Sequence, residues 1–267
     1  MKSLSLGALA GALLLAGCQP QLTVGEICRQ DPQMCQDLNR DGWCRQSRAE
    51  VIRARHQEAN SDDPLFLYDQ LVALEEYVDC MGHVSRIVNT SPAKPREQER
   101  NRYYLAGLAS LEALQQATQG HSSPALSLYH WTRFNDGPAL ERFLEAEAQG
   151  QLAATRLKRL AGIYFSAEQP QKAREYLLEV IEADPAGARL DEQLLLELGF
   201  TLERLGQREA AYLFSYLGQQ RLAQGGAGAL AGHLGIGSRQ AAELRQQAVL
   251  LDEAMADDSF DRESLNL

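Results

Sequence analysis

One feature limits the possible folds of this chain more than any other: a pattern of apolar and small residues that occurs twice in its second half. The first copy has helical spacing and ends in a proline, with Leu157, Leu160, Ala161, Tyr164, Ala173, Leu177, Val180 and Pro185. The second copy begins 38 residues later, with Leu195, Leu198, Gly199, Leu202, Gly206 and Ala211. Side chains three and four residues apart share one face of a helix. Each copy therefore predicts two helices packed as a hairpin.

The pattern resembles the tetratricopeptide repeat, a helical hairpin of about 34 residues with small residues where its two helices cross. Ser215 and Gly218 depart from that pattern in the second copy, and extra residues around Gly187 separate the copies. Two hairpins of ordinary helix could also imitate it. Because about three repeats are needed to bury a continuous core, residues 124–149 are interpreted as a third, degenerate unit.

Helical spacing continues through the rest of the chain, and no segment has the alternation typical of a strand. Prolines and glycines separate predicted helices at about 45–59, 64–88, 96–118 and 238–256, because both residue types interrupt a helix interior. The third of these helices should turn several side chains inward, namely Tyr104, Leu105, Leu108, Leu111 and Leu114. The glycines between 225 and 237 are expected to form a flexible connector, and the acidic residues 257–267 a loose tail.

The predicted fold class is all-α. Residues 96–224 would form helical hairpins stacked as a tetratricopeptide-like solenoid. Residues 27–90 would form a cysteine-bearing helical hairpin ahead of them. The predicted staple of this hairpin is a set of disulfides, since an even number of cysteines outside the cytosol is first interpreted in that way.

The cysteines concerned are Cys28, Cys35, Cys44 and Cys80, for which three pairings are possible. The hairpin predicted for this segment turns near residue 62. Cys44 and Cys80 lie 18 residues on either side of that turn and should sit side by side, which leaves Cys28 to pair with Cys35. A zinc site is the competing interpretation, but no pair has the Cys-x-x-Cys spacing that presents two ligands from one turn.

The N-terminus predicts export from the cytosol. Residues 1–17 contain one lysine and an apolar stretch from Leu4 to Leu15. That stretch has the length of the core of a secretory signal peptide and is shorter than the roughly 20 residues that span a bilayer. A buried apolar helix is the alternative interpretation.

The apolar stretch ends in Leu15-Ala16-Gly17-Cys18, which resembles the lipobox of bacterial lipoproteins. The resemblance implies cleavage before Cys18, lipid on its thiol, and residues 18–26 as a lipidated tether. Gln19 stands where an aspartate would resemble an inner-membrane retention signal, so the implied location is the periplasmic face of the outer membrane. An ordinary signal peptide with a chance cysteine is the alternative.

One short segment has the oxygen donors of a calcium loop. Asp37, Asn39 and Asp41 alternate along the chain and Gly42 follows at the sixth position. Arg48 occupies the twelfth position, where a glutamate should supply two oxygens. The competing interpretation is a turn held between two cysteines.

Signatures of catalysis are missing from the sequence. It has no His-Glu-x-x-His, no Gly-x-Ser-x-Gly and no phosphate-binding glycine loop followed by lysine. The five histidines are scattered, and no two share a ligand spacing. No cofactor is predicted, and an enzyme is the less favoured class.

The solenoid interpretation predicts a surface that binds partners. In tetratricopeptide repeats the first helix of each hairpin lines a concave groove, and the register places there Lys158, Gly162, Phe165, Ser166, Leu196, Phe200, Glu203 and Arg204. Two exposed aromatic rings would suit a peptide or a partner helix. The alternative is that Phe165 and Phe200 are covered by a neighbouring helix. The formal net charge of −10 argues against nucleic acid as a partner.

The cysteine segment, from Ile27-Cys28 through Asp37-Leu38-Asn39 to Cys44-Arg45 and Val51-Ile52, resembles a family of proteobacterial lipoproteins known only as domain of unknown function 2989. The resemblance implies a location and no mechanism. The leading hypothesis is a membrane-anchored, non-enzymatic adaptor for periplasmic or outer-membrane proteins. The alternatives are a cell-envelope enzyme with a scattered site, acting on peptidoglycan, and a purely structural lipoprotein.

Overall fold

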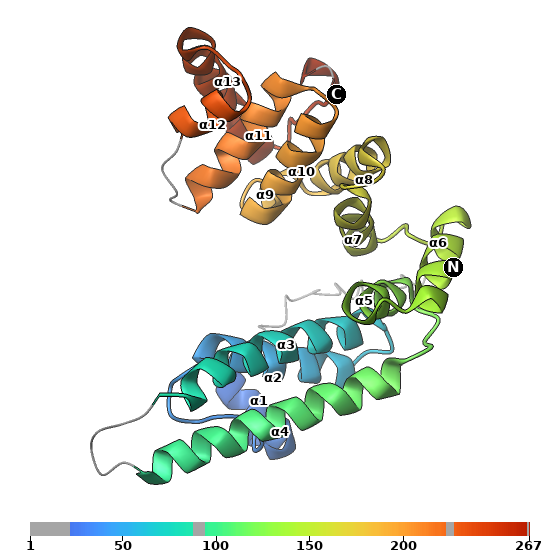
Figure 1. The fold of residues 1–267 in the computed structure, drawn as a ribbon, viewed down its shortest axis with the longest axis vertical. Coiled ribbons are helices and arrows are strands. Elements are labelled where there is room, and N and C mark those ends of the chain that lie inside the picture. The colour runs from blue at the N-terminus through green and yellow to red at the C-terminus, as the bar shows by residue number, and fades with distance from the viewer. Residues whose placement is uncertain (1–21, 88–93, 223–226, 266) are drawn as a thin grey trace, which may run out of the picture. The chain divides into compact units, whose positions relative to one another are not determined.

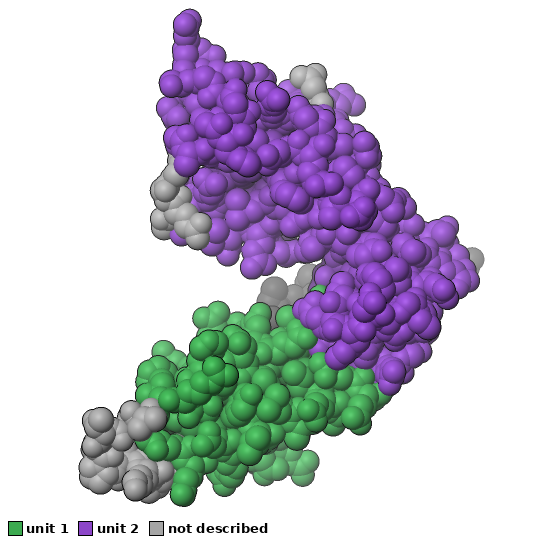
Figure 2. Space-filling view, viewed as in Figure 1, with its two compact units in different colours: residues 1–117 green, residues 118–267 purple. Residues whose placement is uncertain are grey.

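In the computed structural model, residues 22–87, 94–222, 227–265 and 267 are described, and these residues form helices and no strand (Figure 1). The prediction of an all-α fold is confirmed. The chain divides into two compact units, residues 1–117 and 118–267 (Figure 2). No helix among the described residues combines the length and the apolar character needed to cross a bilayer. The predicted signal peptide and Cys18 lie outside the described residues.

The first unit contains four α-helices among its described residues. Their bounds are α1 Val24–Gln30, α2 Arg45–Ala59, α3 Leu65–Ser85 and α4 Lys94–Thr118, the last of which ends at the start of the second unit. Helices α2 and α3 form the antiparallel hairpin that the sequence predicts. Cys44 is joined to Cys80 across this hairpin, and Cys28 to Cys35 in the segment before it. This is the pairing that equal distances from the turn favoured.

Helix α4 packs against α3 at two glycines. A Cβ atom on Gly107 would lie 3.1 Å from the ring of Tyr77, and one on Gly82 would lie 3.3 Å from the ring of Tyr104. Because the glycines set this contact, α4 buries Tyr103 and Leu111, whereas Leu105 is 61% exposed. The expectation that Leu105 faces inward is therefore wrong.

The second unit is a series of helix pairs. Their bounds are α5 Pro124–Phe134 with α6 Gly137–Ala148, α7 Thr155–Phe165 with α8 Pro170–Ala183, and α10 Glu192–Arg204 with α11 Arg208–Arg221. The short α9 spans Pro185–Ala188 and α13 spans Ser238–Ala256. Helix α8 also packs against α10, and α11 against α13, so consecutive pairs are stacked. Aromatic side chains form much of the core that joins the first two pairs, including Phe143 and Phe165.

The C-terminal segments are more ordered than the sequence suggests. Within the predicted glycine-rich connector, residues Ala227–His233 form the helix α12. The tail after Asp257 is not loose, because Phe260 and Leu265 pack against the core of the second unit. Arg262 in this tail forms ion pairs with Glu175 and Glu182 of α8. Charge composition alone does not reveal these pairs, which join residues more than eighty positions apart.

Candidate functional site

The two hairpins α7–α8 and α10–α11 each cross at a glycine. A Cβ on Gly162 of α7 would lie 2.6 Å from Leu177, and one on Gly199 of α10 would lie 2.2 Å from the hydroxyl of Ser215. Both glycines also approach the carbonyl of an alanine, Ala173 or Ala211 in the second helix of each hairpin. The two glycines are therefore structurally equivalent, although they are 37 residues apart and the second helices follow the 38-residue spacing.

This shift by one residue corrects the predicted groove. It makes Phe165 equivalent to Leu202, and both side chains are buried. The ring of Phe165 is 1% exposed and lies between Phe143 of α6 and Tyr176 of α8, with ring centroids 6.1 and 6.2 Å away. Phe165 is therefore a core residue, and its assignment to a partner-binding surface is wrong.

The same shift pairs Ile163 of α7 with Phe200 of α10. Both side chains are large, apolar and close to half exposed, at 44% and 45%. The Arg204 guanidinium, one turn after Phe200, lies 5.8 Å from the centroid of its ring. The structure thus displays one apolar side chain on the first helix of each hairpin, at equivalent positions.

Two polar bridges hold the first helices together on this side. Near the start of α7, the Arg159 guanidinium donates two hydrogen bonds to the carboxylate of Asp191, the residue that caps α10. Beyond the end of α7, Arg204 donates to the backbone carbonyl of Ala167. Arg159 and Ile163 are one turn apart on α7, as Phe200 and Arg204 are on α10. We define Arg159, Ile163, Phe200 and Arg204 as the α7–α10 face.

The other residues of the predicted groove are occupied within the fold. Lys158 forms an ion pair with Glu179 of α8 at 2.6 Å. Leu196 fills the space that a Cβ on Gly218 would need. Ser166 and Glu203 are also engaged, since the first is buried and the second pairs with His233 of α12 at 2.8 Å. Of the predicted set, Phe200 and Arg204 are the residues that belong to the α7–α10 face.

The calcium-loop candidate is a cross-linked turn. The Asp37 carboxylate accepts two hydrogen bonds from Arg55 of α2, both at 2.7 Å. The Asp41 carboxylate accepts from Arg100 Nε at 2.9 Å, and Asn39 donates to Asp41 and to the Trp43 carbonyl. Arginines thus occupy the two carboxylates, and no group of three or more metal-ligating side chains occurs among the described residues. The loop does not have the arrangement of a calcium site.

Two pKa shifts follow from the same turn. Burial raises the pKa of the Tyr77 phenol to about 12, and its oxygen accepts a hydrogen bond from the backbone N–H of Asn39 at 2.8 Å. Burial also acts to raise the pKa of Asp41. The hydrogen bonds from Asn39, Arg100 and the Trp43 backbone outweigh that effect, so the pKa of Asp41 lies below its ordinary value. Asp41 is therefore held in its charged form.

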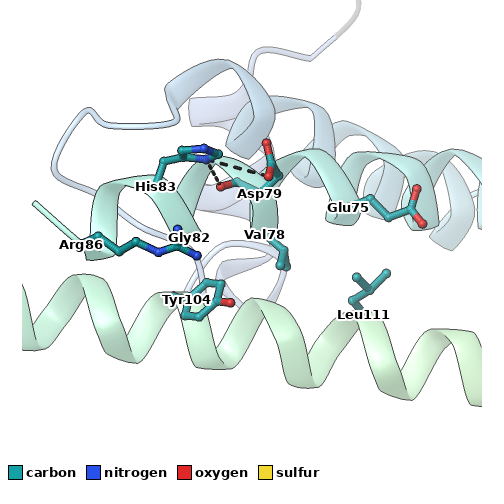
Figure 3. A pocket seen from close by; sticks show the side chains of 8 residues that line it. All are labelled: Glu75, Val78, Asp79, Gly82, His83, Arg86, Tyr104 and Leu111. Carbon is teal, nitrogen blue, oxygen red and sulfur yellow. Dashed lines mark hydrogen bonds and ion pairs between the residues drawn. The ribbon is translucent and has the colours of Figure 1, made fainter.

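A small hollow of about 260 Å³ lies along the seam between α3 and α4 (Figure 3). Its floor is apolar, because Tyr104 and Leu111 project from α4 toward Val78 of α3. The His83 ring is bonded to the Asp79 carbonyl of its own helix at 2.9 Å and lies on the side of α3 away from α4. His83 and Asp79 are thus turned away from the floor of the hollow.

Sequence reasoning missed Ile163, Arg159 and Asp191. Apolar spacing alone did not distinguish Ile163 from its buried neighbours, and the bridge from Arg159 to Asp191 spans 32 residues. The available signal was the glycine pair, because Gly162 and Gly199 reveal the register when they are aligned with each other.

Comparison with known proteins yields a family and no activity. Residues 15–216 match the family described as "Protein of unknown function (DUF2989)". No curated protein and no solved structure matches the chain. The match includes both first helices that form the α7–α10 face and extends into α11. Since it covers more than half of the sequence, this chain belongs to the DUF2989 family.

Proposed function

We propose that this protein is a lipid-anchored periplasmic adaptor that binds a partner protein through its α7–α10 face. One observation carries the proposal: Ile163 and Phe200 are nearly half exposed at equivalent positions of two stacked hairpins. Exposed aromatic side chains on rigid elements are frequent anchors of protein interfaces. The ligand that suits this face is an extended or helical segment with apolar side chains.

The rigidity of the face supports a role in binding. Gly162 and Gly199 allow close crossings within each hairpin, and Arg159 and Arg204 tie α7 to α10. A surface that is already ordered loses little conformational entropy when a partner binds. We further propose that these hairpins are tetratricopeptide-like repeats, since small residues lie where their helices cross.

The proposed location rests on the N-terminal sequence and on the cysteines. The lipobox-like residues at 15–18 would direct lipid to Cys18, and Gln19 would favour the outer membrane. Disulfides persist in oxidising compartments such as the periplasm, which agrees with the two in this protein. Replacing the lipid acceptor, Cys18→Ser, should move the protein from the membrane fraction to the soluble fraction. Retention in the membrane fraction would contradict lipid anchoring.

Photocrosslinking in intact cells tests the proposed face. A photoreactive phenylalanine analogue at position 200, and separately at position 163, should yield the same discrete crosslinked partner. The analogue at position 105 is the matched control, because Leu105 is exposed on α4 of the other unit. The substitution Ile163→Ala should weaken the crosslink formed at position 200.

Two results would contradict the adaptor proposal. One is the same crosslink at position 105 as at position 200, which would indicate nonspecific contact. The other is no discrete crosslink at positions 163 and 200. That result would return the enzyme and structural-lipoprotein hypotheses to first place.

A further inference from the structure

A second surface, in the first unit, has the features of an anion-binding site. The turn between Cys35 and Cys44 and the N-terminal part of α4 enclose a hollow of about 440 Å³. Its lining is mostly polar and includes Asn39, Arg40, Asp41, Glu99, Arg102 and Tyr103. This hollow shares no residue with the α7–α10 face.

The turn that carries Arg40 is fixed on both sides. Cys35 and Cys44 are both in disulfides, and Asn39 is 2% exposed. The Asn39 backbone donates to the buried Tyr77, and its side chain donates to Asp41 and to the Trp43 carbonyl. Arg40 therefore projects from a rigid turn.

The arginines around the hollow outnumber the carboxylates. Asp41 is bound by Arg100, which is 7% exposed and whose Nη1 has no hydrogen-bond partner among the described residues. Arg102 is separated from Glu99 by 3.8 Å, and both side chains are about two-thirds exposed. Such a pair is weak. With Arg40, these residues are three cations and two anions, in a protein whose overall charge is −10.

We propose that this hollow binds the carboxylate of a peptide, with Arg40 and Arg102 as the groups that contact it. A guanidinium presents two parallel N–H donors, which match the two oxygens of a carboxylate. A single negative charge balances the local excess of one cation, whereas a doubly charged phosphate would be repelled more strongly by Asp41 and Glu99.

An aromatic ring beside the turn provides apolar contact area for the peptide. Trp43 follows Gly42 in the turn and is 47% exposed, with the Arg100 guanidinium 5.6 Å from its ring centroid. Arg100 thus holds both Asp41 and one side of the Trp43 ring. A carboxylate attached to an apolar residue could contact the arginines and this ring together.

The fluorescence of Trp43 reports binding directly, because Trp131→Phe leaves it as the single tryptophan of the chain. The probes are N-acetylphenylalanine and its neutral amide, added at low salt to the full-length protein in detergent. The carboxylate probe should change the emission saturably, and the amide should not. The pair Arg40→Gln and Arg102→Gln should weaken the apparent affinity at least tenfold, whereas the control Arg53→Gln on the exposed side of α2 should leave it unchanged.

Three results would overturn the proposal. They are a change that never saturates, an equal response to the amide, and an unaltered affinity after both arginines are replaced. Inorganic phosphate that binds as tightly as the carboxylate would refute the selection for a single charge. Far-ultraviolet circular dichroism of each variant shows that a loss of binding is not a loss of folding.

Discussion

The two units of this protein are stabilised in different ways. In the first unit, a disulfide and arginine–aspartate pairs join segments that are distant in sequence, as Cys44–Cys80 and Arg55–Asp37 show. The second unit contains no cysteine and relies on apolar cores and on close crossings at glycine. The stability of the first unit should therefore depend on redox conditions. The second unit, which carries the α7–α10 face, should not depend on them.

The largest effect is expected from the core aromatic of the second unit. Phe165→Ala should lower the free energy of unfolding by about 3–5 kcal/mol, because it removes a buried ring and leaves a cavity. Phe200→Ala is the matched control and should change stability by about 0.5 kcal/mol or less, since its ring is half exposed. Urea unfolding monitored by Trp131 fluorescence measures both. Similar losses for the two variants would contradict the assignment of Phe165 to the core.

The hairpin disulfide should have the next largest effect, and its loss should affect the first unit. Replacing Cys44 and Cys80 by alanine should cost about 4 kcal/mol, whereas replacing Cys28 and Cys35 should cost about 2.5 kcal/mol. The difference follows from sequence separations of 36 and 7 residues. Trp43 fluorescence during urea unfolding of a Trp131→Phe background measures it. A larger loss from the shorter loop would contradict the loop-entropy explanation.

A smaller effect is expected at the glycine crossing of α10 and α11. Gly199→Ala should destabilise the second unit by about 1–3 kcal/mol, because its Cβ would lie 3.0 Å from the backbone nitrogen of Ser215. Gly232→Ala in α12 is the control, since nothing lies within 4 Å of its Cβ position. Thermal unfolding of both variants compares them. Equal melting temperatures would show that the crossing is looser than described.

The smallest effect concerns the response of the second unit to acid. Burial, together with the charge of Arg142, lowers the pKa of His130 from its ordinary value of about 6.5. The unfolded chain then binds the proton more readily, so stability falls as the pH drops below about 6.5 and levels off below the folded pKa. Stability measured with Trp131 between pH 7 and 5 should show this slope, and His130→Gln should reduce it. An unchanged slope would assign the dependence to other groups.

Much of the fold follows from local sequence signals. Prolines and helical spacing predicted a helix at 45–59, which is α2, and the equal offsets of Cys44 and Cys80 favoured their pairing. These features were predictable because they depend on neighbours along the chain or on a single hairpin. The grouping of α4 with the repeat region was not supported, since the boundary between the compact units falls at its end.

The candidate site was predicted less well, for a physical reason. Repeat spacing was taken as 38 residues throughout, but Gly162 and Gly199 show that the first helices are offset by 37. A shift of one residue rotates a helical position by about 100°, which is enough to exchange Phe165 for Ile163 on the surface. The ion pairs of Arg100 and Arg262 join distant segments, and no local pattern predicts them.

Hydrogen exchange of the full-length protein, with and without a reductant, tests most directly the claim that the two units are stabilised differently. Reduction should accelerate the exchange of backbone amides in α2 and α3, which the Cys44–Cys80 disulfide joins. Amides of α7, α8, α10 and α11 should keep their protection, because the second unit contains no cysteine. Equal loss of protection in both units, or none in α2 and α3, would contradict the account.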